Sequence, residues 1–241
     1  MEFGLSFGAA HYFGDLAQEY LNPKSIGPMA GVFTRYSISS YFEWRNQASF
    51  AQFGADDANS AFYKTRNLNF ETNIYEFAST IEFNFLSFGI NKRNNELDFT
   101  PYAFIGLGGF YFNPKGTYNG ETISLRELRT ENQDYSLFQL NVPLGMGAKL
   151  AFSSRFEIGF EIGFRRLFTD YLDDVSTVYP NFNELEQDRG LAAAQASHAH
   201  TYNDNIPAQP GSMRGDNHIT DAYIYTNFTL AYRLVKRDPC P

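Results

Sequence analysis

Two carboxylates and an arginine recur at even spacing in RFEIGFEIGFRRLF, residues 155 to 168. Glu157, Glu161 and Arg165 share one parity, and the alternate positions from Phe156 to Phe164 are all Phe or Ile. In a strand, this alternation sends the two sets to opposite faces. Paired carboxylates are candidates for acid and base catalysis, but an unpaired one is costly in a low-dielectric wall. We therefore expect a structural ion-pair network here rather than a catalytic site.

Four histidine and aspartate residues in the stretch before the last strand have the types of metal ligands. His198 and His200 lie near Asp204 in QASHAHTYNDN, and His218 follows. Two imidazoles and a carboxylate are suitable zinc ligands. However, no cysteine completes the set, and the surrounding Ala, Ser, Asn, Gln and Pro residues are typical of a solvated loop. We expect no metal here.

Two other groups of residues have the types of functional residues. One is the set of aspartates in FTDYLDDVS, and the other is Ser176 at the end of that motif together with His11 near the start of the chain. Asp170, Asp173 and Asp174 suggest calcium, but their spacing lacks the regular oxygen ligands of an EF-hand, and we interpret them as polar caps of a strand end. Ser176 and His11 have the types of a nucleophile and base, yet no G-x-S-x-G elbow is present and nothing fixes their proximity. We expect a non-enzymatic protein without a cofactor.

Composition favours one all-β domain over residues 1–241. The 19 Lys and Arg against 27 Asp and Glu give a net charge of −8, which argues against nucleic acid or an anionic lipid surface as partner. Aromatic residues make up 17% of a chain whose mean hydropathy is −0.37, so apolar surface alternates with polar surface. The single cysteine, Cys240, has no partner for an internal disulfide. Because the chain begins almost inside a strand, we expect a signal peptide upstream that is removed.

Eight segments alternate with period two, and their connections alternate between long and short. The segment 99–112 has apolar residues at both parities, which leaves its register open. This pattern predicts an eight-stranded up-and-down antiparallel transmembrane β-barrel, with long extracellular loops and short periplasmic turns. The segments are 3–13, 29–38, 41–53, 73–86, 99–112, 138–152, 155–168 and 222–234, and the long loops are 14–28, 54–72, 113–137 and 170–221.

A soluble lipocalin-like barrel or sandwich is the alternative, because alternation alone does not show whether the apolar face meets a protein core or lipid. Charges of both signs among glycines fit a crowded lumen better, and an eight-stranded interior is just wide enough for side chains to fill, so we expect a plug rather than a pore. The expected lumen ion-pair network is Arg35, Glu43, Arg45, Glu76, Glu82, Lys149, Glu157, Glu161, Arg165 and Arg233. We also expect an interfacial aromatic girdle of Tyr12, Phe13, Phe112, Phe168, Tyr171 and Tyr223.

Five longer motifs span nearly the whole chain. They are EFGLSFGAAHYFGDL, FTPYAFIGLGGFYFNPK, PLGMGAKL, EIGFRRLFTDYLDDVS and RGDNHITDAYIYTNFTLAYRL. With these motifs the chain resembles the PorG-like family (DUF6089 type) of small outer-membrane barrels from Bacteroidetes, which are components of the type IX secretion system. Asp170, Tyr171, Asp173, Asp174, Arg214 and Gly215 correspond to the recurrent loop motifs of that family, which carry no assigned chemical role.

The resemblance implies an outer-membrane accessory of protein export. Its partners would be outer-membrane lipid and, at the periplasmic face, a ring of PorK-type lipoprotein and PorN-type protein. If the topology holds, that ring meets the short turns and the tail, where Lys92, Arg93 and Lys236 are the candidate contacts. A small surface barrel whose long loops bind a ligand or mediate adhesion is the alternative that the sequence leaves open.

Overall fold

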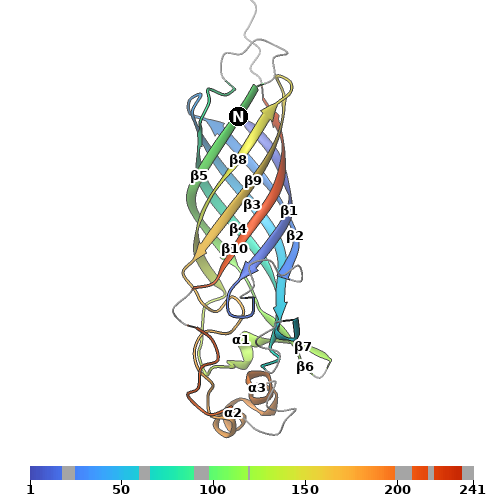
Figure 1. Cartoon of the computed structure of the whole chain (residues 1–241), viewed down its shortest axis with the longest axis vertical. Helices are drawn as coiled ribbons and strands as arrows, with labels where there is room; N and C mark the ends of the chain where they lie inside the picture. Colours follow the sequence, from blue (N-terminus) through green and yellow to red (C-terminus); the bar gives the residue numbers. More distant parts are fainter. Residues whose placement is uncertain are drawn as a thin grey trace, which may run out of the picture.

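The structure, a computed structural model, describes residues 1–17, 25–59, 66–89, 98–118, 120–198, 208–216 and 220–234. Each of eight strands pairs antiparallel with the next, and the last pairs with the first, which confirms the predicted up-and-down barrel. Figure 1 shows the tilted strands closing into a tall cylinder. The strands are β1 (Glu2–Phe13), β2 (Ile26–Ser37), β3 (Phe42–Asp56), β4 (Asn69–Asn84), β5 (Asp98–Tyr111), β8 (Phe138–Ala151), β9 (Phe156–Leu167) and β10 (Ala222–Arg233).

The polarity of the barrel is the reverse of that of a water-soluble protein. The largest fully buried side chains include Arg35, Arg45 and Lys149, whereas Leu107 and Met146 are 72% and 69% exposed. An apolar exterior around a charged, closed interior is suited to a bilayer, where every backbone polar group must be paired within the barrel. The chain is therefore a transmembrane β-barrel. No helix among the described residues is long and apolar enough to cross a membrane.

The register of β5, which the sequence left open, is set by its pairing with β4 and β8. Tyr102 and Phe104 point into the lumen, where they are at most 4% exposed, and Ile105 lies on the outer face. The inward glycines give room to side chains of the neighbouring strand, because a Cβ at Gly108 would lie 2.2 Å from Oδ1 of Asn141, its register partner on β8. Glycine therefore occupies the lumen-facing positions where long polar side chains cross.

The two ends of the barrel differ, and we call them the turn end and the loop end. At the turn end, β2–β3 and β8–β9 are joined by short turns. At the loop end, beyond the strand ends in Figure 1, the longer connections fold into a cap. The cap contains η2 (Asp57–Asn59), β6 (Lys115–Tyr118), β7 (Glu121–Ser124), α1 (Leu125–Leu128), α2 (Phe182–Arg189) and α3 (Leu191–Ser197).

The predicted loop boundaries differ from the structure around residues 54–72. There β3 continues to Asp56 and β4 begins at Asn69, so both strands extend past the barrel rim. The hairpin β6–β7 pairs with this extension through Glu71 and Lys115. The cap is thus anchored on a strand pair that rises out of the barrel.

The predicted aromatic girdle is wrong for Tyr12, Phe112 and Tyr223. These three side chains are 0% exposed and form part of an apolar core that fills the loop end of the lumen. Tyr12 has the same parity as Ser6, so it points inward with the rest of that face. Phe168 does lie outside, at 63% exposure. Aromatic side chains that are exposed on the outer face include Tyr36, Phe42, Trp44, Phe99, Phe156 and Tyr232 toward the turn end, and Phe50, Tyr75, Tyr111 and Phe138 toward the loop end.

Candidate functional site: the filled lumen and the loop cap

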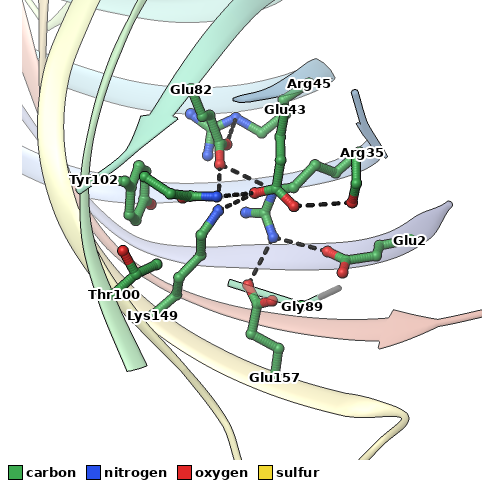
Figure 2. Close-up of polar contacts among 12 residues, drawn as sticks. Glu2, Arg35, Glu43, Arg45, Glu82, Gly89, Thr100, Tyr102, Lys149 and Glu157 are labelled. Carbon is green, nitrogen blue, oxygen red and sulfur yellow. Dashed lines mark hydrogen bonds and ion pairs between the residues drawn. The ribbon is translucent and has the colours of Figure 1, made fainter. Parts of the chain in front are cut away.

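Arg35 on β2 is the centre of the ion-pair network at the turn end of the lumen. Its guanidinium lies 2.6 Å from Glu157, 2.9 Å from Glu2 and 3.1 Å from Glu82. Figure 2 shows these carboxylates converging on it from different strands. The side chain of Arg35 is 0% exposed, so its charge is balanced by protein groups rather than by water.

The adjoining pairs extend this network across the lumen. Lys149 on β8 contacts Glu43 and lies 2.8 Å from Glu82. Arg45 on β3 lies 2.6 Å from Glu161 on β9, and the hydroxyl of Tyr102 donates to the same carboxylate at 2.6 Å. Opposite walls of the barrel are therefore joined by charge-assisted hydrogen bonds.

Arg233 closes the network near the barrel end. It lies 2.7 Å from Glu2 and 3.4 Å from Glu157, and its side chain is 19% exposed. Glu2 was missed from the sequence because the first strand was started one residue too late. The parity of β1 was the available signal, since Glu2 shares it with Ser6 and pairs with both Arg35 and Arg233.

A second polar cluster occupies the middle of the lumen around Glu76. Its carboxylate accepts from the amide of Asn141 at 2.7 Å and from the hydroxyl of Tyr223 at 2.5 Å, with Arg165 at 3.6 Å. The guanidinium of Arg165 lies 4.0 Å from the ring centroid of Tyr225. The sequence did not predict that Asn141, Tyr223 and Tyr225 belong to the lumen network.

All ten residues named from the sequence lie inside the barrel, in the two clusters just described. Apart from Arg233, their side chains are at most 3% exposed. The glycines between them leave the required space, since a Cβ at Gly163 would lie 2.3 Å from Nη1 of Arg165. The arrangement fills the lumen with paired charges.

The loop motif residues converge in the cap. The carboxylate of Asp173 accepts from the hydroxyl of Tyr12 at 2.5 Å and from the amide of Val175 at 2.9 Å. Asp221 shares the Tyr12 hydroxyl at 3.1 Å and accepts from the amide of Leu172 at 2.8 Å. Burial raises the pKa of Asp173 and of Asp221 well above the usual value; the carboxylate of Asp15 raises the pKa of Asp173 further, and that of Asp173 raises the pKa of Asp221.

Arg214 ties three parts of the cap together. It lies 2.8 Å from Glu131 and donates to the backbone carbonyl of Asp174 at 2.6 Å. The carboxylate of Asp174 accepts from Thr130 and, at 2.7 Å, from the hydroxyl of Tyr135. Burial raises the pKa of Asp174 to about 6, although Arg214 opposes the shift. These groups act as a buried polar clamp between loops.

A second arginine, Arg66, holds the loops next to Arg214. Arg66 makes two hydrogen bonds to Asp57, at 2.7 and 2.8 Å, and donates at 2.8 Å to the backbone carbonyls of Asp15 and Arg214. This two-pronged geometry fixes the planar guanidinium, so loops from three parts of the chain meet at one side chain.

The remaining loop motif residues line the same cap. Asp170 accepts from the hydroxyl of Ser176 at 2.8 Å, and burial raises its pKa to about 7. The ring of Tyr171 stacks on that of Tyr135 at 4.8 Å. Gly215 leaves space that no other residue would, because a Cβ there would lie 2.5 Å from Oδ2 of Asp15 and 2.7 Å from the amide nitrogen of Ser176. The six motif residues thus serve a common loop assembly.

The other candidates that lie among the described residues, His11, Ser176 and His198, are not brought together. His11 lies on the outer face of β1 with its ring 4.4 Å from that of Phe13, whereas Ser176 is buried in the cap and bonds Asp170, so the two are not brought together as base and nucleophile. His198 is buried against Tyr179 and Phe182. Within the described part of the chain, no group of three or more His, Cys, Asp or Glu residues could hold a metal ion.

Six further residues named from the sequence fall outside the described ranges. They are His200, Asp204 and His218 of the metal hypothesis, and Lys92, Arg93 and Lys236 of the partner hypothesis.

A family model described as a domain of unknown function, DUF6089, matches residues 1–189. The chain belongs to the DUF6089 family. No curated protein matches this DUF6089 chain.

Several solved structures resemble the DUF6089 barrel. One is Ail, the attachment invasion locus protein of Yersinia pestis, in complex with the heparin analogue sucrose octasulfate, with 11% identity, a TM-score of 0.43, and 97% of this chain and 98% of that chain covered. The outer membrane protein OprG from Pseudomonas aeruginosa has 8% identity and a TM-score of 0.44, covering 96% and 94%. Neisserial surface protein A has 8% identity and a TM-score of 0.43, covering 96% and 97%. The assignment of the fold rests on the strand register described above.

Proposed function

We propose that this chain is a non-enzymatic outer-membrane component of the type IX protein secretion system. In this role it anchors a periplasmic ring of PorK-type lipoprotein and PorN-type protein, or assists its assembly. The proposal is supported by the resemblance of its loop and strand motifs to the PorG-like barrels and by its membership of the DUF6089 family.

The observation that carries the proposal is the filled lumen. Arg35, Arg45 and Lys149 cross the interior and are bound to carboxylates on several strands. Passage of a solute would require these buried pairs to separate, which is strongly unfavourable. A barrel of this kind acts through its ends and its outer face, as an anchor does, rather than as a conduit for cargo.

The turn end is the surface that a periplasmic ring would contact. It is compact in the described residues, with Ser39 and Ser40 in one turn and the exposed Arg155 in another. Basic side chains there fit an anionic ring surface. Lys92 and Arg93, which follow β4, and Lys236, which follows β10, are the proposed contacts from the sequence.

Charge reversal distinguishes the two ends. Lys92→Glu with Arg93→Glu should reduce co-purification of the PorK-type lipoprotein from outer membranes. The matched control is Arg126→Glu with Arg129→Glu, a pair of partly exposed arginines in the cap that both pair with Asp134 at the surface, Arg126 also donating to the backbone carbonyl of Tyr135 at 3.3 Å. Unchanged co-purification with the first double variant, or an equal loss with the control, would contradict a ring contact at the turn end.

The ordered cap favours a second candidate function, a surface barrel whose loops bind an external ligand or mediate adhesion. Arg66 and Arg214 hold the loops in a fixed arrangement, and loops held in this way are suited to recognition. Deletion of the gene separates the two functions. Lost export of cargo supports the secretion role, whereas normal export with lost adhesion supports the surface role.

A further inference from the structure

A polar row crosses the lipid-facing side of β2, β3 and β4. Asn46 on β3 is paired in register with Thr34 on β2 and with Ser79 on β4. Along β3 the outward residues run from Phe42 to Phe50, so Asn46 lies at the middle of this largely apolar run. The row therefore lies deep within the part of the wall that faces hydrocarbon.

Among the described residues, the serine of this row has a hydrogen-bond partner for its side chain and the asparagine has none. The indole nitrogen of Trp44 donates to the hydroxyl of Ser79 at 2.8 Å. No hydrogen bond among the described residues involves the side chain of Asn46, which is partly exposed. A primary amide facing hydrocarbon without a partner is costly, because lipid tails offer neither donor nor acceptor.

A groove runs beside this amide on the outer face. Its volume is about 530 Å³, and Phe3, Leu5, Val32, Thr34, Asn46 and Ala48 are among its lining residues. Phe77 lines the groove as well, and the side chains of Val32 and Phe77 are 57% and 58% exposed. Small side chains such as Thr34 and Ala48 and large apolar ones such as Phe77 thus line the groove together.

We propose that this face binds a second copy of the chain, with the two Asn46 amides meeting near a twofold axis. A primary amide both donates and accepts, so two copies satisfy each other, whereas a lipid tail satisfies neither. A twofold interface also requires a self-complementary patch, and a groove bordered by exposed apolar side chains such as Val32 and Phe77 allows each copy to insert side chains into the other. Small residues in the lining, such as Thr34 and Ala48, permit close approach, as between membrane helices.

The proposal rests on the barrel spanning a bilayer and is independent of the secretion role. Cysteine cross-linking in native outer membranes tests it, because the only natural cysteine, Cys240, is removed by Cys240→Ser. In that background, Asn46→Cys should give a disulfide-linked band of twice the chain mass. The matched control is Ile162→Cys, an outward residue at the middle of β9, four strands away around the eight-stranded barrel.

A second variant tests the amide itself. Ala48→Cys should also cross-link, and adding Asn46→Leu should abolish that cross-link while the barrel still shows its folded, heat-modifiable mobility in electrophoresis. Three results would overturn the proposal: no more cross-linking at position 46 than at 162, a cross-link only to a band of another mass, or a dimer that survives Asn46→Leu. The first would show that lipid covers the row, the second that a different protein does, and the third that two copies associate without the Asn46 amides.

Discussion

Replacing Arg35 with methionine should destabilise the barrel, because it removes one charge from a buried network that has no solvent to replace it. Three carboxylates lie within 3.1 Å of its guanidinium. Breaking a buried ion pair by removing one partner costs about 3–5 kcal/mol. Glu82 keeps Lys149, at 2.8 Å, and Glu2 keeps Arg233, at 2.7 Å. We therefore expect a loss near the lower end of that range.

Among the three carboxylates, Glu157 loses most when Arg35 is replaced, because its other cation, Arg233, lies 3.4 Å away. Arg35→Met with Glu157→Gln should consequently be more stable than Arg35→Met alone. The assay is urea unfolding in phospholipid vesicles, followed by the fluorescence of the single tryptophan, Trp44, on the outer face. Arg126→Met is the control, since a surface pair contributes only about 0–1 kcal/mol. An Arg35→Met variant as stable as this control, or a double variant no better than the single, would refute the reasoning.

Three further predictions concern the cap and the outer face. Burial raises the pKa of Asp15 to about 6, of Asp170 to about 7 and of Asp174 to about 6. Because these folded-state values lie above the unfolded value of about 4, their contribution to stability is fully present below about pH 4 and is lost as pH rises from there through the folded values of about 6 to 7. Hydrogen exchange of cap amides, corrected for intrinsic rates, should accelerate over that window while barrel amides do not; a pH-independent cap would contradict this. Gly215→Ala should loosen the cap, since its Cβ would lie 2.5 Å from a carboxylate oxygen, and limited proteolysis should cut the loops faster while the barrel core resists. Phe160→Lys should lower the free energy of unfolding in vesicles by about 2–4 kcal/mol if the site lies near the midplane, and an unchanged value would place this face in water.

The sequence predicted the barrel wall well, because a period of two is a local property of each strand. Parity alone placed Arg35, Glu82 and Lys149 on the face that the structure shows to be the lumen. Parity also indicates that Tyr12 points inward, because Tyr12 shares the parity of Ser6. The expectation that Tyr12 belongs to an outer girdle did not take this into account. Aromatic residues near a strand end indicate an interface only when their parity is outward.

The cap was beyond sequence reasoning for a physical reason. Its contacts join residues far apart in the chain, such as Arg214 to Glu131 across 83 positions and Tyr12 to Asp173 across 161. No periodicity records such pairs. The aspartates of FTDYLDDVS were expected to cap a strand end, and the contacts of Asp173 reach further than that, because they tie the loops to the wall.

The central claim is that the phenylalanine and isoleucine face of β9 lies in lipid around a filled lumen. Spin labels at Phe156, Ile162 and Phe168, introduced as single cysteines with Cys240→Ser, measure this in vesicles through collisions with oxygen and with a water-soluble nickel chelate. We predict the highest oxygen and lowest nickel accessibility at position 162, with nickel accessibility rising toward 156 and 168. High nickel accessibility at all three positions would contradict this claim, because it would place this face of the strand in water.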